Sequence, residues 1–356
     1  MSELILAGTL LYGEDLEVLN DSYIVVDEGN IKEVGSGAMG LDAALEGIVI
    51  PGFVNAHTHI GDSSAKDLEY LPLDDIVKPP HGIKHRILAE LDLDALVSSM
   101  RESISQMIGC GTVLFSDFRE GGISGAEALR GALYGLNIGC KVFGRDEVSP
   151  EIMDGIGISG ASDMDYKTLL NLKANAKNCD MPLAIHAGEK DASDIDLALE
   201  LSPDLLIHMV HARDSDIKRM AVCEIPLVIC IRSNLVTGVG LPPLSDMLDA
   251  GIVIGIGTDN VMLNSPDILT EIEFVSKLYR LDDGVVLKMA TINGRRILDD
   301  ATYSGIVEGS VADICVVSHK SSNMRGFKDP IRSIVRRATS ADIIAYIRRG
   351  EVEIFK

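Results

Sequence analysis

Residues 49 to 62 read VIPGFVNAHTHIGD: an apolar run, a Pro-Gly kink and two histidines one residue apart. Side chains alternate along a strand, so His57 and His59 project to the same face while Thr58 points away. Both imidazoles can therefore reach a single ion. Because a pair with this spacing also arises by chance at the solvated end of a strand, it predicts a metal site only if further ligands exist elsewhere in the chain.

Apolar runs continue beyond this stretch, and helical patterns separate most of them. The eight runs are 48–57, 112–118, 139–145, 154–160, 182–189, 204–212, 226–234 and 251–260. Eight parallel strands over about 250 residues are the size of a TIM barrel. An open doubly wound sheet that binds a dinucleotide is less well supported, because no GxGxxG sequence follows an early strand. We predict an α/β fold in which residues 51–303 form a (β/α)8 TIM barrel.

Short alternating apolar runs also occur at both ends of the chain. ELILAGTLL and YIVVDEGNIKEVG lie in the first 50 residues, and YSGIVEGSVADICVVS and IIAYIRRGEVEIF lie in the last 54 or so. Chain termini often lie close together on a domain surface. We therefore expect residues 1–50 and 304–356 to form one small β-sandwich domain beside the barrel.

The composition is that of a folded, acidic protein. Hydrophobic residues make up 46% and charged residues 24% of the 356 residues, a balance typical of globular enzymes. The 54 acidic and 32 basic side chains give a formal net charge of −22, which repels nucleic-acid phosphates and anionic membrane surfaces. We expect neither nucleic acid nor a membrane as a partner.

Cysteine usage and the first residues favour a cytoplasmic location. The six cysteines form no CxxC pair, and a chain of this length needs no disulfide framework. The first residues lack a basic segment, and Gly8 and Gly13 interrupt their apolar run. No segment approaches the roughly 18 uninterrupted apolar residues of a membrane helix.

Side chains that can bind a metal ion lie at the ends of four of the eight apolar runs. They are His57 and His59, His186 with Glu189, His208 with His211, and Asp259. Barrel enzymes place their sites at the carboxyl ends of the strands, so these side chains are expected to meet. Three imidazoles and one carboxylate, with a position left for water, are the ligand set of a catalytic zinc or ferrous site. Such an ion lowers the pKa of its water from about 15.7 to about 7.

Several of these segments together resemble the amidohydrolase superfamily, in particular its branch of cytosine deaminases, guanine deaminases and chlorohydrolases. The segments are PGFVNAHTH, IHAGE, HMVHA, ICIRSN, GIGTDN, ATINGRRIL and GIVEGSVADICVV, and they extend over nearly the whole chain. PGFVNAHTH followed at a distance by GTDN is the most specific part of the resemblance. Ile231 stands where the similar segments of the family carry a proline.

The resemblance implies a role for each candidate residue. His57, His59, His186 and Asp259 would hold one divalent metal ion, with zinc preferred over iron(II). Glu189 would be the catalytic acid and base, moving a proton from the water to the leaving amine. His208 would hydrogen-bond the attacking oxygen, and Asp259 would also accept the proton of the water. His211 competes with His208 for the inward position, but the motif favours His208.

A related subgroup holds two metal ions through a carboxylated lysine on the fourth strand. Lys141 lies on the third predicted strand, and the fourth carries no lysine. The sequence therefore favours one metal. Arg145, which ends the third strand, is a candidate to bind an anionic part of the substrate.

The resulting hypothesis is a mononuclear metal-dependent aminohydrolase. Metal-bound hydroxide would attack an aminopurine, aminopyrimidine or related ring, and ammonia would leave. One alternative is hydrolysis of a cyclic amide or a carbon–halogen bond at the same site, and another is a barrel without catalytic activity. The expected partner is a small-molecule substrate, and the family resemblance suggests a homodimer.

Overall fold

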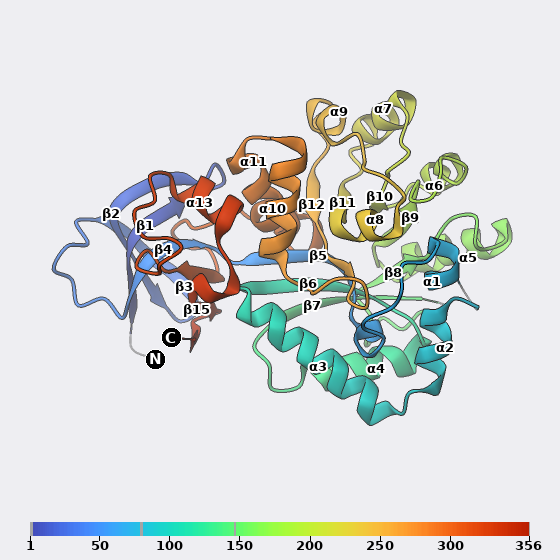
Figure 1. Ribbon diagram of the computed structural model, residues 1–356, viewed down its shortest axis with the longest axis horizontal. Coiled ribbons are helices and arrows are strands. Elements are labelled where there is room, and N and C mark those ends of the chain that lie inside the picture. Colours follow the sequence, from blue (N-terminus) through green and yellow to red (C-terminus); the bar gives the residue numbers. More distant parts are fainter. Residues whose placement is uncertain (1–2, 79–80, 146, 356) are drawn as a thin grey trace.

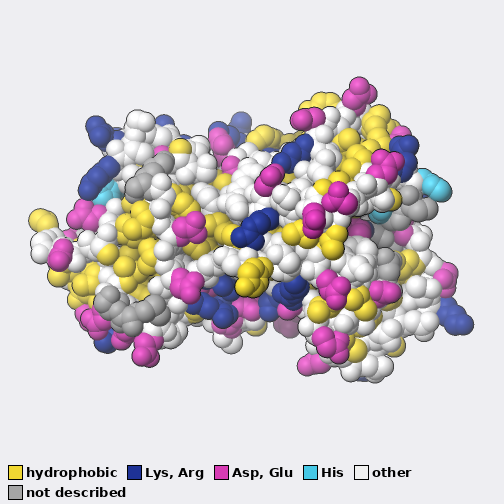
Figure 2. Space-filling view, turned by 90° about the horizontal axis from the view of Figure 1, so that it is seen from below, with side chains coloured by type: hydrophobic (Ala, Val, Ile, Leu, Met, Phe, Trp, Pro, Cys, Tyr) yellow, Lys and Arg dark blue, Asp and Glu magenta, His cyan; other side chains and the backbone are white. Residues whose placement is uncertain are grey.

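The computed structural model describes residues 3–78, 81–145 and 147–355, and two β-sheets dominate it (Figure 1). One is a nine-stranded parallel sheet and the other is a seven-stranded mixed sheet. Both chain termini lie beside the smaller sheet, at one end of the molecule (Figure 1). Figure 2 shows acidic side chains scattered over the face it displays, without a single concentrated patch. Among the described residues, no helix is both long and apolar enough to cross a membrane.

The parallel sheet has a TIM-barrel-like arrangement. Its strands are β5 (Phe53–His59), β6 (Thr112–Arg119), β7 (Gly139–Gly144), β8 (Gly155–Ile158), β9 (Leu183–Ala187), β10 (Leu205–His208), β11 (Leu227–Ile229), β12 (Ile254–Ile256) and β13 (Asp259–Asn260). The strand order is β12-β11-β10-β9-β8-β7-β6-β5-β13. β12 and β13 stand at opposite ends of this order, yet only Gly257 and Thr258 separate them in the chain. The sheet therefore curls until its two edges lie side by side.

Helices connect most of the parallel strands, as the alternation of apolar patterns predicted. They are α3 (Leu93–Gly109), α4 (Gly122–Leu133), α5 (Tyr166–Asn178), α6 (Ile195–Glu200), α7 (Asp214–Val222), α8 (Ile231–Thr237) and α9 (Leu244–Asp249), and α10 (Ile268–Tyr279) follows the last parallel strand. Aspartates begin the longer ones: Asp92 accepts a hydrogen bond from the backbone of Ala95 in α3, and Asp165 accepts one from Thr168 in α5.

The first and last parts of the chain share the seven-stranded sheet. Its strands are β1 (Leu4–Tyr12), β2 (Glu17–Asp27), β3 (Asn30–Ser36), β4 (Leu45–Pro51), β14 (Ile314–Val317), β15 (Ile343–Arg348) and β16 (Glu351–Ile354). β4 from the first part pairs with β14 from the last, antiparallel. This pairing joins the two ends of the chain as expected.

The expected β-sandwich is not confirmed, because the strands form a single mixed sheet. Residues of β4 alternate between two apolar clusters, as the two-residue period of a strand requires. Ile48 and Ile50 belong to the main core, which includes the barrel, whereas Val49 packs with Leu6 and Ile314 in a smaller cluster. The barrel side thus covers one face of the sheet, where a sandwich would need a second sheet.

The apolar run over 48–57, expected as one strand, is two strands in different sheets. β4 ends at Pro51 and β5 begins at Phe53. The intervening Gly52 donates its backbone N–H to the carbonyl of Asp313, at 2.9 Å. A Cβ at Gly52 would lie 2.2 Å from a methyl group of Val113, so only glycine fits where the chain passes from one sheet to the other.

Shorter helices complete the structure. They are η1 (Ile60–Ser64), α1 (Leu73–Val77), α2 (Ile83–Glu90), α11 (Asp283–Lys288), η2 (Met289–Asn293), α12 (Gly294–Leu298), α13 (Pro330–Arg337) and η3 (Ser340–Asp342). The segment after β5 contains three of them, η1, α1 and α2. Pro79 and Pro80 lie outside the described residues. α13 contacts α10 and α11, which lie on the other side of the boundary proposed at residue 303. The division of the chain at residues 50 and 303 therefore stays a prediction.

Candidate metal centre and its cavity

Four of the predicted ligands meet at the carboxyl end of the parallel strands. His57 and His59 lie on β5, His186 on β9 and Asp259 at the start of β13. Asp259 Oδ1 lies 3.3 Å from His57 Nε2 and 3.4 Å from His59 Nε2. His186 Nε2 lies 3.1 Å from His57 Nε2 and 3.4 Å from His59 Nε2. Residues up to 202 positions apart in the chain thus direct their donor atoms to one point.

These distances fit a small cation at the centre of the group. Bonds of about 2.0–2.1 Å around a tetrahedral ion place neighbouring ligand atoms roughly 3.3 Å apart. His59 Nδ1 lies 3.2 Å from the carbonyl of Phe118, and His186 Nδ1 lies 2.9 Å from the carbonyl of Ile158. A proton on each Nδ1 leaves two Nε2 lone pairs facing each other, an arrangement that a shared cation stabilises.

Asp259 supplies an independent test of this fit. Its Oδ1 is buried and has no hydrogen-bond partner among the residues that the structure describes. An unpaired buried carboxylate oxygen is costly unless a cation is bound to it. The donor set and this unpaired oxygen therefore both fit a divalent metal ion.

Burial keeps the three imidazoles in the form that binds metal. It lowers the pKa of His57 to about 4, and it holds the pKa values of His59 and His186 well below the usual value. For Asp259, burial opposes ionisation, but the facing imidazoles of His57 and His208 hold the pKa of its carboxyl well below the ordinary value. At neutral pH these groups are neutral imidazoles and a carboxylate, which are the ligand forms.

The backbone is strained at two site residues. His208 has φ 73° and Asp259 has φ 60°, in the left-handed region that glycine favours. Such conformations cost about 1–3 kcal/mol each and persist where the surroundings hold them. Ser233 donates a hydrogen bond to Asp259 Oδ2, and His208 Nδ1 lies 3.1 Å from Asn234 Oδ1.

Ser233 and Asn234 are site residues to which the sequence analysis gave no role. They belong to the IRSN segment, which was expected at the end of the seventh strand. In the structure β11 ends at Ile229 and this segment begins α8. The resemblance of ICIRSN to the family indicated that this segment matters, but the contacts of Ser233 and Asn234 could not be predicted from the sequence.

Glu189 and His208 face each other near the four ligands. Glu189 Oε2 lies 3.7 Å from His208 Nε2. Burial raises the pKa of Glu189, and its side chain remains 18% exposed toward the cavity. His208 is also close enough to His57 and Asp259 to bind the same ion. His211 is not among the residues that line the cavity.

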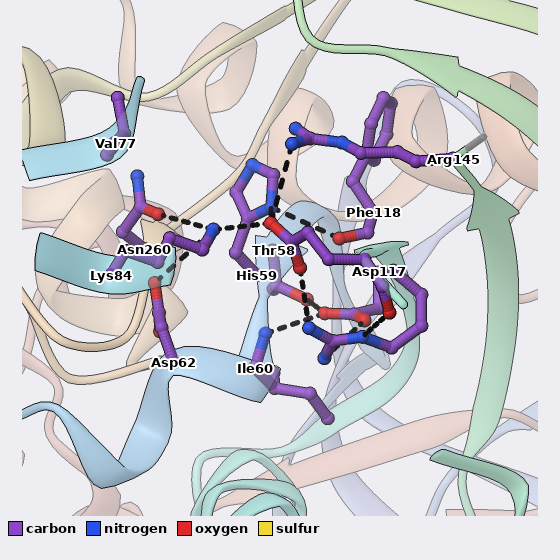
Figure 3. Close-up of polar contacts among 12 residues, drawn as sticks. Thr58, His59, Ile60, Asp62, Val77, Lys84, Asp117, Phe118, Arg145 and Asn260 are labelled. Atoms are coloured by element: carbon purple, nitrogen blue, oxygen red, sulfur yellow. Dashed lines mark hydrogen bonds and ion pairs between the residues drawn. The ribbon is translucent and has the colours of Figure 1, made fainter. Parts of the chain in front are cut away.

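A cluster of buried charges adjoins the centre, and little in the sequence pattern indicated it (Figure 3). Lys84 of α2 is only 2% exposed, and its Nζ lies 2.7 Å from Glu120 Oε1 and 3.3 Å from Asn260 Oδ1. Glu120 directly follows β6, and its Oε1 lies 3.5 Å from His59 Nδ1. Burial opposes ionisation of Glu120, but Lys84 and Arg119 hold its pKa well below the usual value.

Asp117, which ends the second predicted strand, stabilises the turn after β5. Its Oδ1 accepts hydrogen bonds from the backbone N–H of Ile60, at 2.6 Å, and from the hydroxyl of Thr58, at 3.2 Å. Arg119 Nη1 lies 3.4 Å from its Oδ2. Asp117 therefore fixes the position of the histidine-bearing segment.

The structure places two basic residues of the third predicted strand, Lys141 and Arg145, in different surroundings. Lys141 lies on β7, as predicted, and its Nζ pairs with Asp299 Oδ1 at 2.9 Å, away from the candidate ligands. Arg145 follows β7, is 8% exposed, and lines the cavity.

The cavity has a volume of about 280 Å³ and opens directly over the candidate ligands. Its polar lining near the centre comprises His59, His186, His208, Asp259, Glu189, Lys84, Arg145 and Asn260. A substrate entering it would meet the metal ligands and Glu189 together.

A TIM-barrel-like sheet with convergent imidazoles and a carboxylate at its carboxyl edge defines a class of barrel hydrolases. The chain belongs to the amidohydrolase family, whose sequence pattern matches residues 48–352. It is a hydrolase acting on carbon–nitrogen bonds, which confirms the enzyme class predicted from the sequence.

Similar proteins extend over almost the whole chain. A putative aminohydrolase of Methanothermobacter thermautotrophicus is 33% identical, with 97% of each chain covered. A 5-methylthioadenosine/S-adenosylhomocysteine deaminase of Haloarcula marismortui is 27% identical, covering 99% of this chain and 93% of that protein.

Two solved structures share the fold. Atrazine chlorohydrolase from Arthrobacter aurescens TC1, complexed with zinc, has a TM-score of 0.84 at 18% identity, covering 99% of this chain and 95% of that chain. Guanine deaminase from C. acetobutylicum, with bound guanine, has a TM-score of 0.80 at 19% identity, covering 99% and 100%.

Proposed function

We propose that this chain is a mononuclear metal-dependent aminohydrolase that deaminates an amino-substituted heterocycle, an aminopurine, an aminopyrimidine or a related ring. The observation that carries the proposal is the meeting of three histidines and an aspartate beneath a cavity that Glu189 also lines. Relatives named as aminohydrolase and deaminase support the choice of reaction.

The reaction adds water to the ring carbon that bears the amino group and releases ammonia. A carbon–oxygen bond forms, the carbon–nitrogen bond breaks, and the two protons of the water end on the leaving nitrogen and, after rearrangement, on the ring or its oxygen. A divalent metal held by His57, His59, His186 and Asp259 would supply Lewis-acid activation of the water.

Glu189 is positioned to move the protons. It lies at the cavity wall within reach of both the candidate metal centre and a ring above it. A carboxylate there takes a proton from the water and returns it to a ring nitrogen or to the departing amine. Asp259, whose Oδ1 has no hydrogen-bond partner among the described residues, accepts the second proton.

His208 stabilises the oxygen that becomes negative. Because its Nδ1 is directed at Asn234 Oδ1, its Nε2 is the atom that faces the cavity and Glu189. With a proton on both ring nitrogens, His208 donates from Nε2–H to the oxygen as charge develops on it. Arg145 contacts the substrate from the opposite part of the wall.

The test is ammonia release from a panel of aminopurines, aminopyrimidines and aminotriazines, with metal content measured on the same samples. We expect about one divalent ion per chain, zinc before iron(II), and ammonia from at least one ring. Turnover of a cyclic amide or a chloro-substituted ring without any ammonia would favour the alternative hydrolase. Protein that binds no metal and turns over nothing would favour a barrel without catalytic activity.

Three further expectations accompany the proposal. We infer a cytoplasmic location from the reduced cysteines and a homodimer by analogy with the family. We also infer a domain division at residues 1–50 with 304–356 and at 51–303. Measurement of molecular mass in solution and limited proteolysis test the last two.

A further inference from the structure

The charges around the cavity are unevenly distributed. Lys84 and Arg145, from the segments after β5 and β7, lie on either side of His59 (Figure 3). Asp163, Glu189 and Asp194, from the segments after β8 and β9, line the other part of the wall. Lys78, Lys190 and Asp74 also line the wall, but they pair with one another. Near the candidate ligands, the cations Lys84 and Arg145 therefore lie on one side of the cavity, which we call its basic side, and Glu189 lies on the other.

Arg145 has unused hydrogen-bonding capacity toward this cavity. Its side chain is only about a tenth exposed, and its Nε–H has no hydrogen-bond partner in the part of the chain that the structure describes. Its one ion-pair contact is from Nη1 to Glu120 Oε1, at 3.4 Å. A buried guanidinium N–H without a partner is costly, so the arginine is poised for an acceptor that the protein itself does not supply.

Glu120 does not neutralise Arg145 by itself, because other cations hold it more closely. Lys84 Nζ lies 2.7 Å from its Oε1, and Arg119 Nη2 lies 2.5 Å from its Oε2. Asp62 is 3.8 Å from Lys84 Nζ and lies on the far side of Lys84 from Arg145 (Figure 3). Arg145 therefore shares only part of one carboxylate, which leaves its guanidinium able to bind a further acceptor.

The size and lining of the cavity limit what the rest of the ligand can be. Its volume of about 280 Å³ lies below the roughly 300–1,000 Å³ typical of pockets for drug-sized ligands. Among the described residues that line it, histidine is the only aromatic type, and Leu73 and Val77 are the large apolar side chains. A bulky apolar substituent would find little to pack against, whereas a small polar ring fits.

We propose that the substrate is a small single-ring amino-heterocycle that carries an anionic oxygen group, a carboxylate or a phosphate, which Arg145 binds on the basic side of the cavity. The planar guanidinium fork matches such a group, and Lys84 adds positive potential beside it. The ring then lies over the candidate metal centre with its amino-bearing carbon toward Glu189. This inference rests on the proposed deaminase function and specifies its substrate class.

The test uses aminopyrimidine carboxylates, each paired with its neutral carboxamide, and a phosphonate analogue of the same ring. Binding to the metal-loaded protein is measured by isothermal titration calorimetry. We expect the acid to bind at least about tenfold more tightly than the amide, as for the loss of one charge-assisted hydrogen bond. Tighter binding of the phosphonate than of the carboxylate would assign the group to phosphate.

Variants locate the preference in the structure. R145Q should bind acid and amide about equally, and R145K, which keeps the charge but not the fork, should retain part of the preference. K190Q is the matched control, because Lys190 is a cation at the same cavity but is exposed and paired with Asp74 at 2.6 Å. It should leave the preference unchanged.

Equal or weaker binding of the acid by the wild-type protein would overturn the proposal, whatever the variants do. So would an undiminished preference in R145Q and R145K. Ammonia release separates this inference from the proposed function. If only neutral rings are deaminated, the protein is a deaminase but its substrate is not anionic. If acids bind tightly and no ring releases ammonia, the anionic ligand is supported and the deaminase function is rejected.

Discussion

The candidate metal centre and the charged cluster beside it are built in different ways. The centre takes His57, His59 and His186 from strands that the barrel itself positions. The cluster takes Lys84 from α2, in the segment between β5 and β6, and Arg145 from the segment after β7. Strand ends have fixed geometry, whereas connecting segments vary in length and course. In the proposed function, the strand ends hold the metal ion, whereas the connecting segments carry Glu189 and the residues that would bind the substrate.

The largest effect is expected when a strand-borne ligand is removed. His57→Ala should lose bound metal, and turnover should fall to background, because the remaining donors no longer surround the ion. Metal analysis and ammonia assays measure both. His85→Ala is the control, since the Nε2 of His85 hydrogen-bonds the carbonyl of Val77, at 2.9 Å, and His85 does not line the cavity among the described residues. Full metal content in the His57 variant would refute the assigned centre.

A smaller loss is expected when the proton-transfer group is changed and the ligands are kept. Glu189→Gln should retain metal but lose turnover by about 100- to 10,000-fold, the usual contribution of general acid–base catalysis. Glu200→Gln, on the exposed side of α6, should keep its activity. Wild-type rates in the Glu189 variant would remove this residue from the mechanism.

Removing a member of the charged cluster should affect folding as well as binding. Lys84→Met leaves Glu120 and Asp62 buried beside each other with less compensation, so the free energy of unfolding should fall by about 3–5 kcal/mol. Chemical denaturation measures it. Lys190→Met, at an exposed pair, should leave the unfolding free energy unchanged. A stable Lys84 variant would mean that the cluster is less dependent on this lysine than its contacts indicate.

The smallest effect is expected at a residue that only positions another. Asn234→Ala removes the partner of His208 Nδ1, so kcat should fall about tenfold, the value of one hydrogen bond to a catalytic group. KM and metal content should change little. A rise in KM without a change in kcat would instead place Asn234 in substrate binding.

The barrel was predictable because its signals are local and repeated. Apolar runs with a strand period alternate with helical patterns in the sequence. The strands and helices of the structure lie at these positions, with ends that differ by a few residues. The split of the run at Gly52 was not predictable, because two sheets that meet at one residue leave the sequence pattern continuous. The β-sandwich was expected for a related reason: alternation predicts two faces but does not say that the barrel covers one of them.

The candidate site also has one part that the sequence predicted and one part that only the tertiary structure decided. The two-residue period by itself placed His57 and His59 on one face, and strand ends supplied His186 and Asp259. Only the tertiary structure decided that Lys84 is buried and that Ser233 and Asn234 contact the site from the first turn of α8. Side-chain direction along a strand follows from backbone geometry within a few residues, whereas burial of a lysine depends on which distant segments close over it.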